Sequence, residues 1–203
     1  MKKLERYSYI LVPIVVVLLG CIRVILEHDG ILIFEGDSYH QMYQFYLGGW
    51  ERVHAGSLPL FAYSIGFGGC IMAMFYYLFS PFFLLAVPLI KDMVQYAFLY
   101  LNELKIVFIF IFTFIYAKRI ATHDSTPWLV SFMMAFGGWV FSYLHLNVFL
   151  DAYLVYPLVF YFIEVYLDEK KIVGLCLSLA ITGLINYYFM YLLIPFACIY
   201  ALV

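Results

Sequence analysis

Residues 7–26 read YSYILVPIVVVLLGCIRVIL and form a long apolar run directly after the basic residues Lys2, Lys3 and Arg6. A helix of about 20 residues crosses roughly 30 Å of hydrocarbon, whereas the apolar core of a secretory signal has only about 7–15 residues. No small-residue cleavage pattern follows the run. The segment is therefore predicted to be a membrane anchor with its N-terminus in the cytoplasm, because basic residues favour that side.

The composition of the whole chain agrees with a membrane location. Of its 203 residues, 67% are hydrophobic, 22% are aromatic and only 12% are charged, whereas about 25% are charged in an ordinary soluble domain. These values exclude a soluble globular domain and a disordered chain, and the lack of a basic surface excludes a nucleic-acid binder. The four cysteines form no C-x-x-C pair, so neither a disulfide framework nor a structural zinc site is predicted.

Further apolar segments follow the first one. The stretch 71–90 contains Pro81 and Pro88 and follows the glycine-rich residues 66–69, so it is predicted to be a re-entrant or interfacial element rather than a span. The predicted spans after the first are residues 96–117, 128–144, 152–167, 172–185 and 189–203. The sequence therefore predicts an all-α polytopic membrane protein with about six transmembrane helices.

The basic residues set the expected topology. With one net crossing between residues 70 and 117, Lys118, Arg119, Lys170 and Lys171 all share the cytoplasmic side with the N-terminus. Counting both apolar pieces in that interval as crossings would place Lys118 and Arg119 outside, which the distribution of basic residues disfavours. Because the chain stops inside an apolar run, residues 1–203 are expected to be a single membrane domain and the N-terminal part of a longer protein.

Residues 27–69 are predicted to form an extracellular loop, because they hold five acidic residues and only one basic residue, Arg52. Ser38 followed by Gln41 is a capping-box pattern that predicts the start of a helix. An amphipathic helix over about residues 38–54, lying in the outer membrane interface, is therefore expected. Its predicted apolar stripe consists of Tyr39, Met42, Tyr43, Tyr46, Leu47, Trp50 and Val53.

Two carboxylates are candidates for chemistry on the outer side. Asp37 stands at the start of the predicted helix, with His40, Gln41 and Gln44 on one face beside it. A carboxylate there could take a proton from a hydroxyl nucleophile, or it could simply cap the helix. Asp151 follows an outer turn on the same side, so the topology allows a shared site of two carboxylates.

Several short motifs together resemble a known family. They are residues 36–41 (GDSYHQ), 55–60 (AGSLPL), 66–69 (GFGG), 76–82 (YYLFSPF), 136–139 (FGGW), 156–158 (YPL) and 186–191 (NYYFMY). Their order resembles the N-terminal part of the bacterial YfhO family of membrane proteins, which is similar to the GT-C class of polytopic glycosyltransferases. The resemblance extends over nearly all 203 residues and implies a GT-C-like fold.

The resemblance also implies where the chemistry lies. GT-C enzymes carry an acidic motif in the first outer loop, where the acid serves as catalytic base or metal ligand. Asp37 is the matching position here, Glu35 stands two residues before it, and Asp151 is the candidate for a second acid in the next outer loop. Arg52, His54 and His40 are the loop candidates for binding the phosphate of a donor. No cofactor is firmly implied; if a divalent metal binds, Asp37 and Asp151 are its candidate ligands.

The resulting hypothesis is a membrane glycosyltransferase that moves a sugar from a polyprenyl-phosphate donor to a cell-wall polymer such as lipoteichoic acid. It would act on the outer face of the bacterial cytoplasmic membrane, with the lipid bilayer, the donor and the polymer acceptor as its partners. The alternatives are a transporter or flippase-like module for a lipid-linked sugar, and an inactive truncated scaffold. A transporter needs ionisable residues near the middle of the bilayer, whereas nearly all the ionisable residues of this chain are expected at the ends of the spans, which favours the enzyme.

Overall fold

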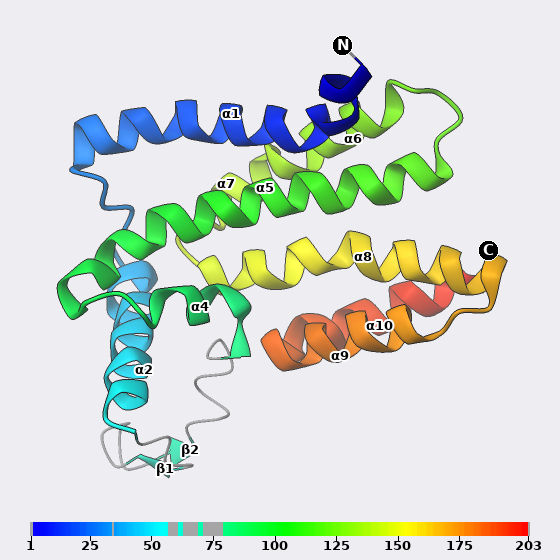
Figure 1. The fold of residues 1–203 in the computed structure, drawn as a ribbon. Coiled ribbons are helices and arrows are strands. Elements are labelled where there is room, and N and C mark those ends of the chain that lie inside the picture. The colour runs from blue at the N-terminus through cyan, green and yellow to red at the C-terminus, as the bar shows by residue number, and fades with distance from the viewer. Residues whose placement is uncertain (1, 34, 57–60, 63–68, 71–78, 203) are drawn as a thin grey trace.

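The computed structural model describes residues 2–33, 35–56, 61, 62, 69, 70 and 79–202. Long helices run roughly along one axis and form a bundle (Figure 1). Its helices are α1 (Lys2–His28), α5 (Val94–Ile120), α6 (Thr126–Ala135), α7 (Gly138–Ser142), α8 (Asn147–Glu169), α9 (Val173–Ile185) and α10 (Tyr187–Leu202). Between α1 and α5 lie the π-helix η1 (Ser38–Tyr43), α2 (Gln44–His54), the strands β1 (Phe61–Ala62) and β2 (Gly69–Cys70), α4 (Pro81–Ala86) and the 3-10 helix η3 (Lys91–Met93). The two short strands pair antiparallel, with Phe61 opposite Cys70.

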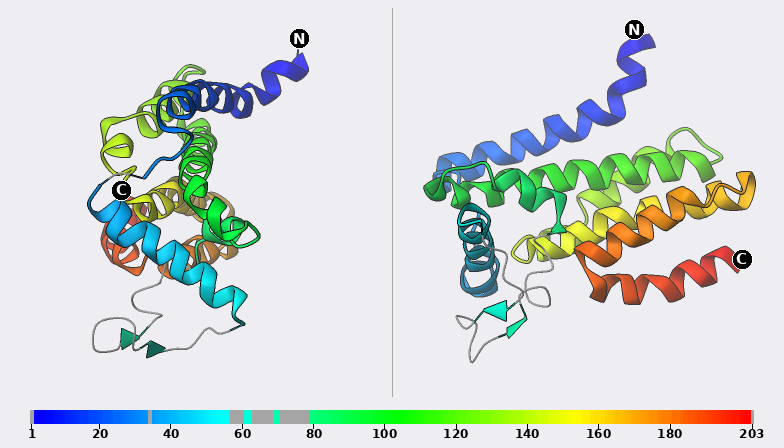
Figure 2. Two further views of the ribbon diagram at one scale, coloured as in Figure 1. Left: turned by 90° about the vertical axis from the view of Figure 1, so that its left-hand side faces the viewer. Right: turned by 60° about the horizontal axis from the view of Figure 1, so that its bottom comes forward.

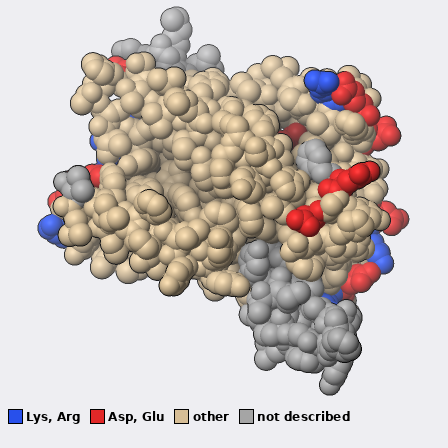
Figure 3. All heavy atoms as spheres, turned by 180° about the vertical axis from the view of Figure 1, so that it is seen from behind, with Lys and Arg blue, Asp and Glu red and all other residues tan. Residues whose placement is uncertain are grey.

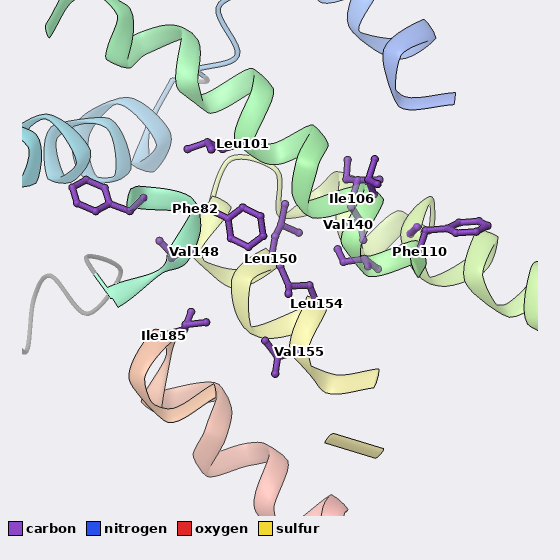
Figure 4. Close-up of a cluster of buried hydrophobic side chains, with 14 of the residues drawn as sticks. Phe82, Leu101, Ile106, Phe110, Val140, Val148, Leu150, Leu154, Val155 and Ile185 are labelled. Carbon is purple, nitrogen blue, oxygen red and sulfur yellow. The ribbon is translucent and has the colours of Figure 1, made fainter. Parts of the chain in front are cut away.

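Helix α5 lies at the centre of the bundle. It packs against α1, α6 and α8, and α8 in turn packs against α9 and α10. The core between these helices is apolar: Phe82 of α4, Phe110 of α5, Val140 of α7 and Leu150 of α8 belong to one buried cluster (Figure 4). Apolar side chains on all sides of α5 suit a helix with neighbours on several sides. By contrast, only 17% of the residues in the most apolar 18-residue stretch of α1 are buried, so most of α1 faces outward.

The structure confirms an all-α membrane protein. Among the described residues, three helices are long and apolar enough to cross a membrane: residues 7–28, 91–120 and 147–169. The other expected spans are also helices at the expected places, but α9 and α10 are shorter, and the segment 128–144 is divided into α6 and α7. At the division, a Cβ on Gly137 would lie 2.4 Å from the carbonyl oxygen of Met133, so only glycine fits the backbone there.

Successive long helices run in alternating directions along the bundle (Figures 1 and 2). The N-terminus and the turns at residues 121–125 and 170–172 lie at one end of the bundle (Figures 1 and 2). Helix α2, the turn at 143–146 and the junction between α9 and α10 lie at the other, which we call the loop end. Charged side chains gather at both ends, with a broad uncharged band between them (Figure 3). The assignment of the loop end to the outside of the cell stays a prediction.

The interrupted stretch 71–90 is described only from residue 79 onward. Its first part and the glycine-rich residues 66–68 lie outside the described residues. The described part contains the short helix α4, which begins at Pro81 and is capped by Ser80, whose hydroxyl accepts a hydrogen bond from the Phe82 amide at 3.2 Å. Within its described length, this stretch does not form a long helix.

The division between α6 and α7 gives a stability prediction. Gly137→Ala would place a methyl group against the Met133 carbonyl, and backbone cannot move aside cheaply, so it should destabilise the protein by about 1–3 kcal/mol. Gly138→Ala is the matched control, because a Cβ at Gly138 meets no atom within 4 Å. Melting temperatures in detergent, followed by size-exclusion elution after heating, measure both. Equal melting temperatures for the two variants would contradict this account of the division.

Candidate active site

Helix α2 lies across the loop end of the bundle, transverse to the long helices (Figure 1). Trp50 donates its indole N–H to the carbonyl oxygen of Leu89 at 2.8 Å, and Glu51 pairs with Lys91 at 2.6 Å. Its inner face is buried at Tyr46 and Gly49. Helix α2 therefore has a buried inner face, and it is attached to the segment that leads into α5.

The segment begins at Ser38, as the sequence predicts, but not through the expected caps. The Asp37 side chain makes no cap hydrogen bond, and its backbone is already helical. Ser38 is buried, and its hydroxyl makes no hydrogen bond within the described part of the chain, so the capping box is not formed. The first turn is instead π-helical. At its start, the His40 amide N–H donates a hydrogen bond to the Gly36 carbonyl oxygen at 2.8 Å. Asp37 is exposed, and its side chain does not cap the helix.

The other loop candidates lie on the outer side of the same segment. His40, Gln41 and Gln44 are exposed, as is Glu35. His54 stacks on Trp50 with ring centroids 3.8 Å apart, and its Nδ1 lies 3.0 Å from the Trp50 carbonyl oxygen. Arg52 is half-buried and makes contacts of its own. Tyr39, expected in the apolar stripe, is 49% exposed.

Asp151 has a different environment. It lies one turn into α8, is fully buried, and pairs with the equally buried Lys105 of α5, with 2.9 Å between Nζ and Oδ1. The Lys105 ammonium also donates to the Asn147 carbonyl at 2.9 Å and lies 5.4 Å from the centre of the Phe82 ring. Asp151 is thus an enclosed partner of a cation, not an exposed group at a helix top.

Two hydroxyl groups complete this buried polar cluster. Ser80, which caps α4, lies near the Asp151 carboxylate, and Tyr46 of α2 lies near the side chain of Asn147. Both residues are fully buried. Burial raises the pKa of the Tyr46 hydroxyl well above its ordinary value, and the charge of Asp151 adds to that increase. Tyr46 therefore stays protonated at any physiological pH and can donate a hydrogen bond.

An apolar groove leads away from this cluster between α4, α5, α8 and α9. Its volume is about 540 Å³, and it extends along α5 from Leu104 to Phe112, a distance of about 12 Å at the rise of an α-helix. Phe82 lines the groove and also lies against the Lys105 ammonium, so the end of the groove adjoins the ion pair. The groove is suited to an alkyl chain whose polar end lies near the buried cluster.

Asp37 and Asp151 lie at the same end of the molecule. The π-helix η1, which follows Asp37, packs against α8. Asp37 faces the surface, however, whereas Asp151 is enclosed. Among the described residues, no three His, Cys, Asp or Glu side chains gather in the way that a metal site requires.

Comparison with known proteins identifies the family of this chain. The profile of the family described as "Bacterial membrane protein YfhO" matches residues 8–203. The chain belongs to the YfhO family. No curated protein and no solved structure matches it.

For this YfhO-family chain, sequence reasoning missed the charged residues inside α5. Glu103 and Lys105 lie near the middle of that helix, so the expectation that nearly all ionisable residues lie at the ends of the spans was wrong for these two. The signal was present, because a charged residue inside an apolar run is by default a candidate for function. What the sequence could not show is that Lys105 faces Asp151 while Glu103 faces Cys21 of α1.

The ion pair gives a second stability prediction. Lys105→Met leaves the buried Asp151 carboxylate without its cation and should cost about 3–5 kcal/mol. The double variant Lys105→Met/Asp151→Leu removes both charges and should recover most of that loss. Melting temperatures of the two variants in detergent measure the difference. A double variant no more stable than the single one would show that the pairing of the two charges is not what stabilises the site.

Proposed function

We propose that this YfhO-family chain is the membrane part of a GT-C-like glycosyltransferase, which moves a sugar from a polyprenyl-phosphate donor to a cell-wall polymer such as lipoteichoic acid. The observation that carries the proposal is the buried Lys105–Asp151 pair at the end of a 540 Å³ apolar groove, on the loop end of the bundle. A lipid-linked donor has the matching chemistry, with an anionic phosphate at the end of a hydrocarbon chain. The choice of sugar donor and of acceptor polymer rests on the resemblance to the GT-C class.

In this proposal the donor enters sideways from the bilayer. Part of its hydrocarbon chain lies in the groove along α5, and its phosphate lies near the cluster, where Lys105 supplies positive charge. Asp151 acts through Lys105 by holding that ammonium in place. Arg52 and His54 on α2 are the further groups for the phosphate, and Glu35, His40, Gln41 and Gln44 line the outer side of the segment for the sugar and acceptor.

The transfer step uses Asp37 as the base. The acceptor hydroxyl attacks the anomeric carbon, the bond from that carbon to the phosphate oxygen breaks, and the polyprenyl phosphate leaves with the electron pair. The hydroxyl proton passes to the Asp37 carboxylate. Asp37 suits this role because it is exposed at the loop end and makes no cap hydrogen bond.

Asp37→Asn tests the role of the base, because it removes the proton acceptor while keeping the size of the side chain. We expect sugar transfer to fall by about 10²–10⁴-fold in proteoliposomes that contain a polyprenyl-phosphate sugar and a membrane-anchored acceptor. Asp29→Asn is the matched control: Asp29 is an exposed carboxylate in the same loop, and asparagine tolerates its positive φ of 51°. Transfer by Asp37→Asn at the rate of the wild type would overturn the assignment.

A transporter of a lipid-linked sugar is the second candidate. The charged residues Glu103 and Lys105 inside α5 favour it, because ionisable groups within a span often mark a translocation path. The same proteoliposomes distinguish the two functions. Movement of the lipid-linked sugar between leaflets by the wild-type chain, without transfer to any acceptor, would favour the transporter over the enzyme.

A further inference from the structure

A second cavity lies on the opposite side of α5 from the groove. It has a volume of about 320 Å³ and is lined by α1, α5 and the α6–α7 region, and we call it the α1–α5 cavity. Val16 and Phe141 belong to its wall and are 37% and 54% exposed at the molecular surface, so the cavity reaches the outer face of the bundle. Residues of that face contact lipid in a protein of this class, so a lipid can reach the cavity from the side.

The polar groups of this cavity are hydrogen-bond acceptors. Asn102 is fully buried and donates its amide N–H to the Leu144 carbonyl at 3.2 Å. Its side-chain oxygen has no hydrogen-bond partner in the part of the chain that the structure describes. The Glu103 carboxylate lies beside it and accepts from the Cys21 thiol. A buried acceptor without a donor is costly, so a ligand that supplies donors would be stabilised here.

The same turn of α5 separates two kinds of polar environment. Asn102 and Glu103 line the α1–α5 cavity, Leu104 lines the groove, and Lys105 faces Asp151 on α8. An anionic headgroup in the α1–α5 cavity would meet the side-chain oxygens of Asn102 and Glu103, and no cationic side chain is among the described residues that line the cavity. An uncharged headgroup with several hydroxyls has no charge that needs a cation, and it offers a donor to the Asn102 side-chain oxygen, which has none within the described part of the chain.

We propose that the α1–α5 cavity binds a membrane lipid with an uncharged polyol headgroup. Its hydroxyls donate to the Asn102 side-chain oxygen and the Glu103 carboxylate, and its chains lie along the apolar wall that includes Val16, Val17 and Phe141. The proposal does not depend on sugar transfer, and binding can be measured without it.

Gly20 offers a way to close the cavity without disturbing the fold. It lines the α1–α5 cavity, and a Cβ at that position meets no atom within 4 Å. Gly20→Leu would therefore fill space that is now open, and leucine also favours a helix more than glycine does. We expect this variant to fold and to lose the lipid.

Lipid retention by the purified full chain tests the proposal. The probes are dihexosyl diacylglycerol, which is uncharged, and phosphatidylglycerol with the same acyl chains, which is anionic. Native mass spectrometry of the chain in detergent measures bound lipid. We expect the wild type to bind the uncharged lipid at least tenfold more tightly, and Gly20→Leu, Asn102→Leu and Glu103→Gln each to weaken that binding about tenfold, as the loss of about 1.4 kcal/mol would do.

Asp124→Asn is the matched control for the loss of a carboxylate, because Asp124 is exposed in the turn at the other end of the bundle. It should bind the uncharged lipid as the wild type does. Glu103→Lys places a cation in the cavity and should shift the preference toward phosphatidylglycerol. Equal binding of the two lipids by the wild type, or unchanged binding by a correctly folded Gly20→Leu, would overturn the proposal. Either result would leave the outcome of the sugar-transfer experiment unaffected.

Discussion

The ion pair between Lys105 and Asp151 is the contact on which the arrangement of the bundle depends. Both side chains are fully buried, 2.9 Å apart, in surroundings where an unpaired charge would be very costly. The pair therefore fixes the position of α8 along α5. At the other end of the same two helices, Arg119 pairs with Asp168 at 2.8 Å, about 21 Å farther along α5 at the rise of an α-helix. With α5 and α8 held at both ends, α1 and α6 pack on α5, and α9 and α10 pack on α8.

The same cluster also positions segments that are distant in the sequence. Ser80 both caps α4 and lies near Asp151, and Tyr46 of α2 lies near Asn147. Apolar packing is strong but not directional, whereas ion pairs and hydrogen bonds depend on distance and angle. The polar cluster can therefore specify one orientation for α2 and α4 where the surrounding apolar contacts would allow several.

Helix α5 also separates the apolar groove from the α1–α5 cavity. Successive residues of one turn face the two spaces: Glu103 lines the cavity, while Leu104 lines the groove beside the Lys105 ammonium. The two spaces thus differ in the charge near their polar ends, with a cation at one and acceptors at the other. Two amphiphiles with different headgroups could occupy the molecule together, each entering from the bilayer on its own side of α5.

The sequence by itself determined the membrane class and the places of the long helices, because the length of an apolar run is a local property of the chain. It also predicted the segment beginning at Ser38 and its amphipathic face, and its motifs indicated the family that the profile match confirms. The tertiary structure decided that Asp37 is exposed while Asp151 is enclosed, and that Lys105 is the partner of Asp151. It also decided where the groove and the α1–α5 cavity lie. These features depend on which faces of separate helices meet, and a one-dimensional pattern of residues does not specify the rotation and shift of one helix against another.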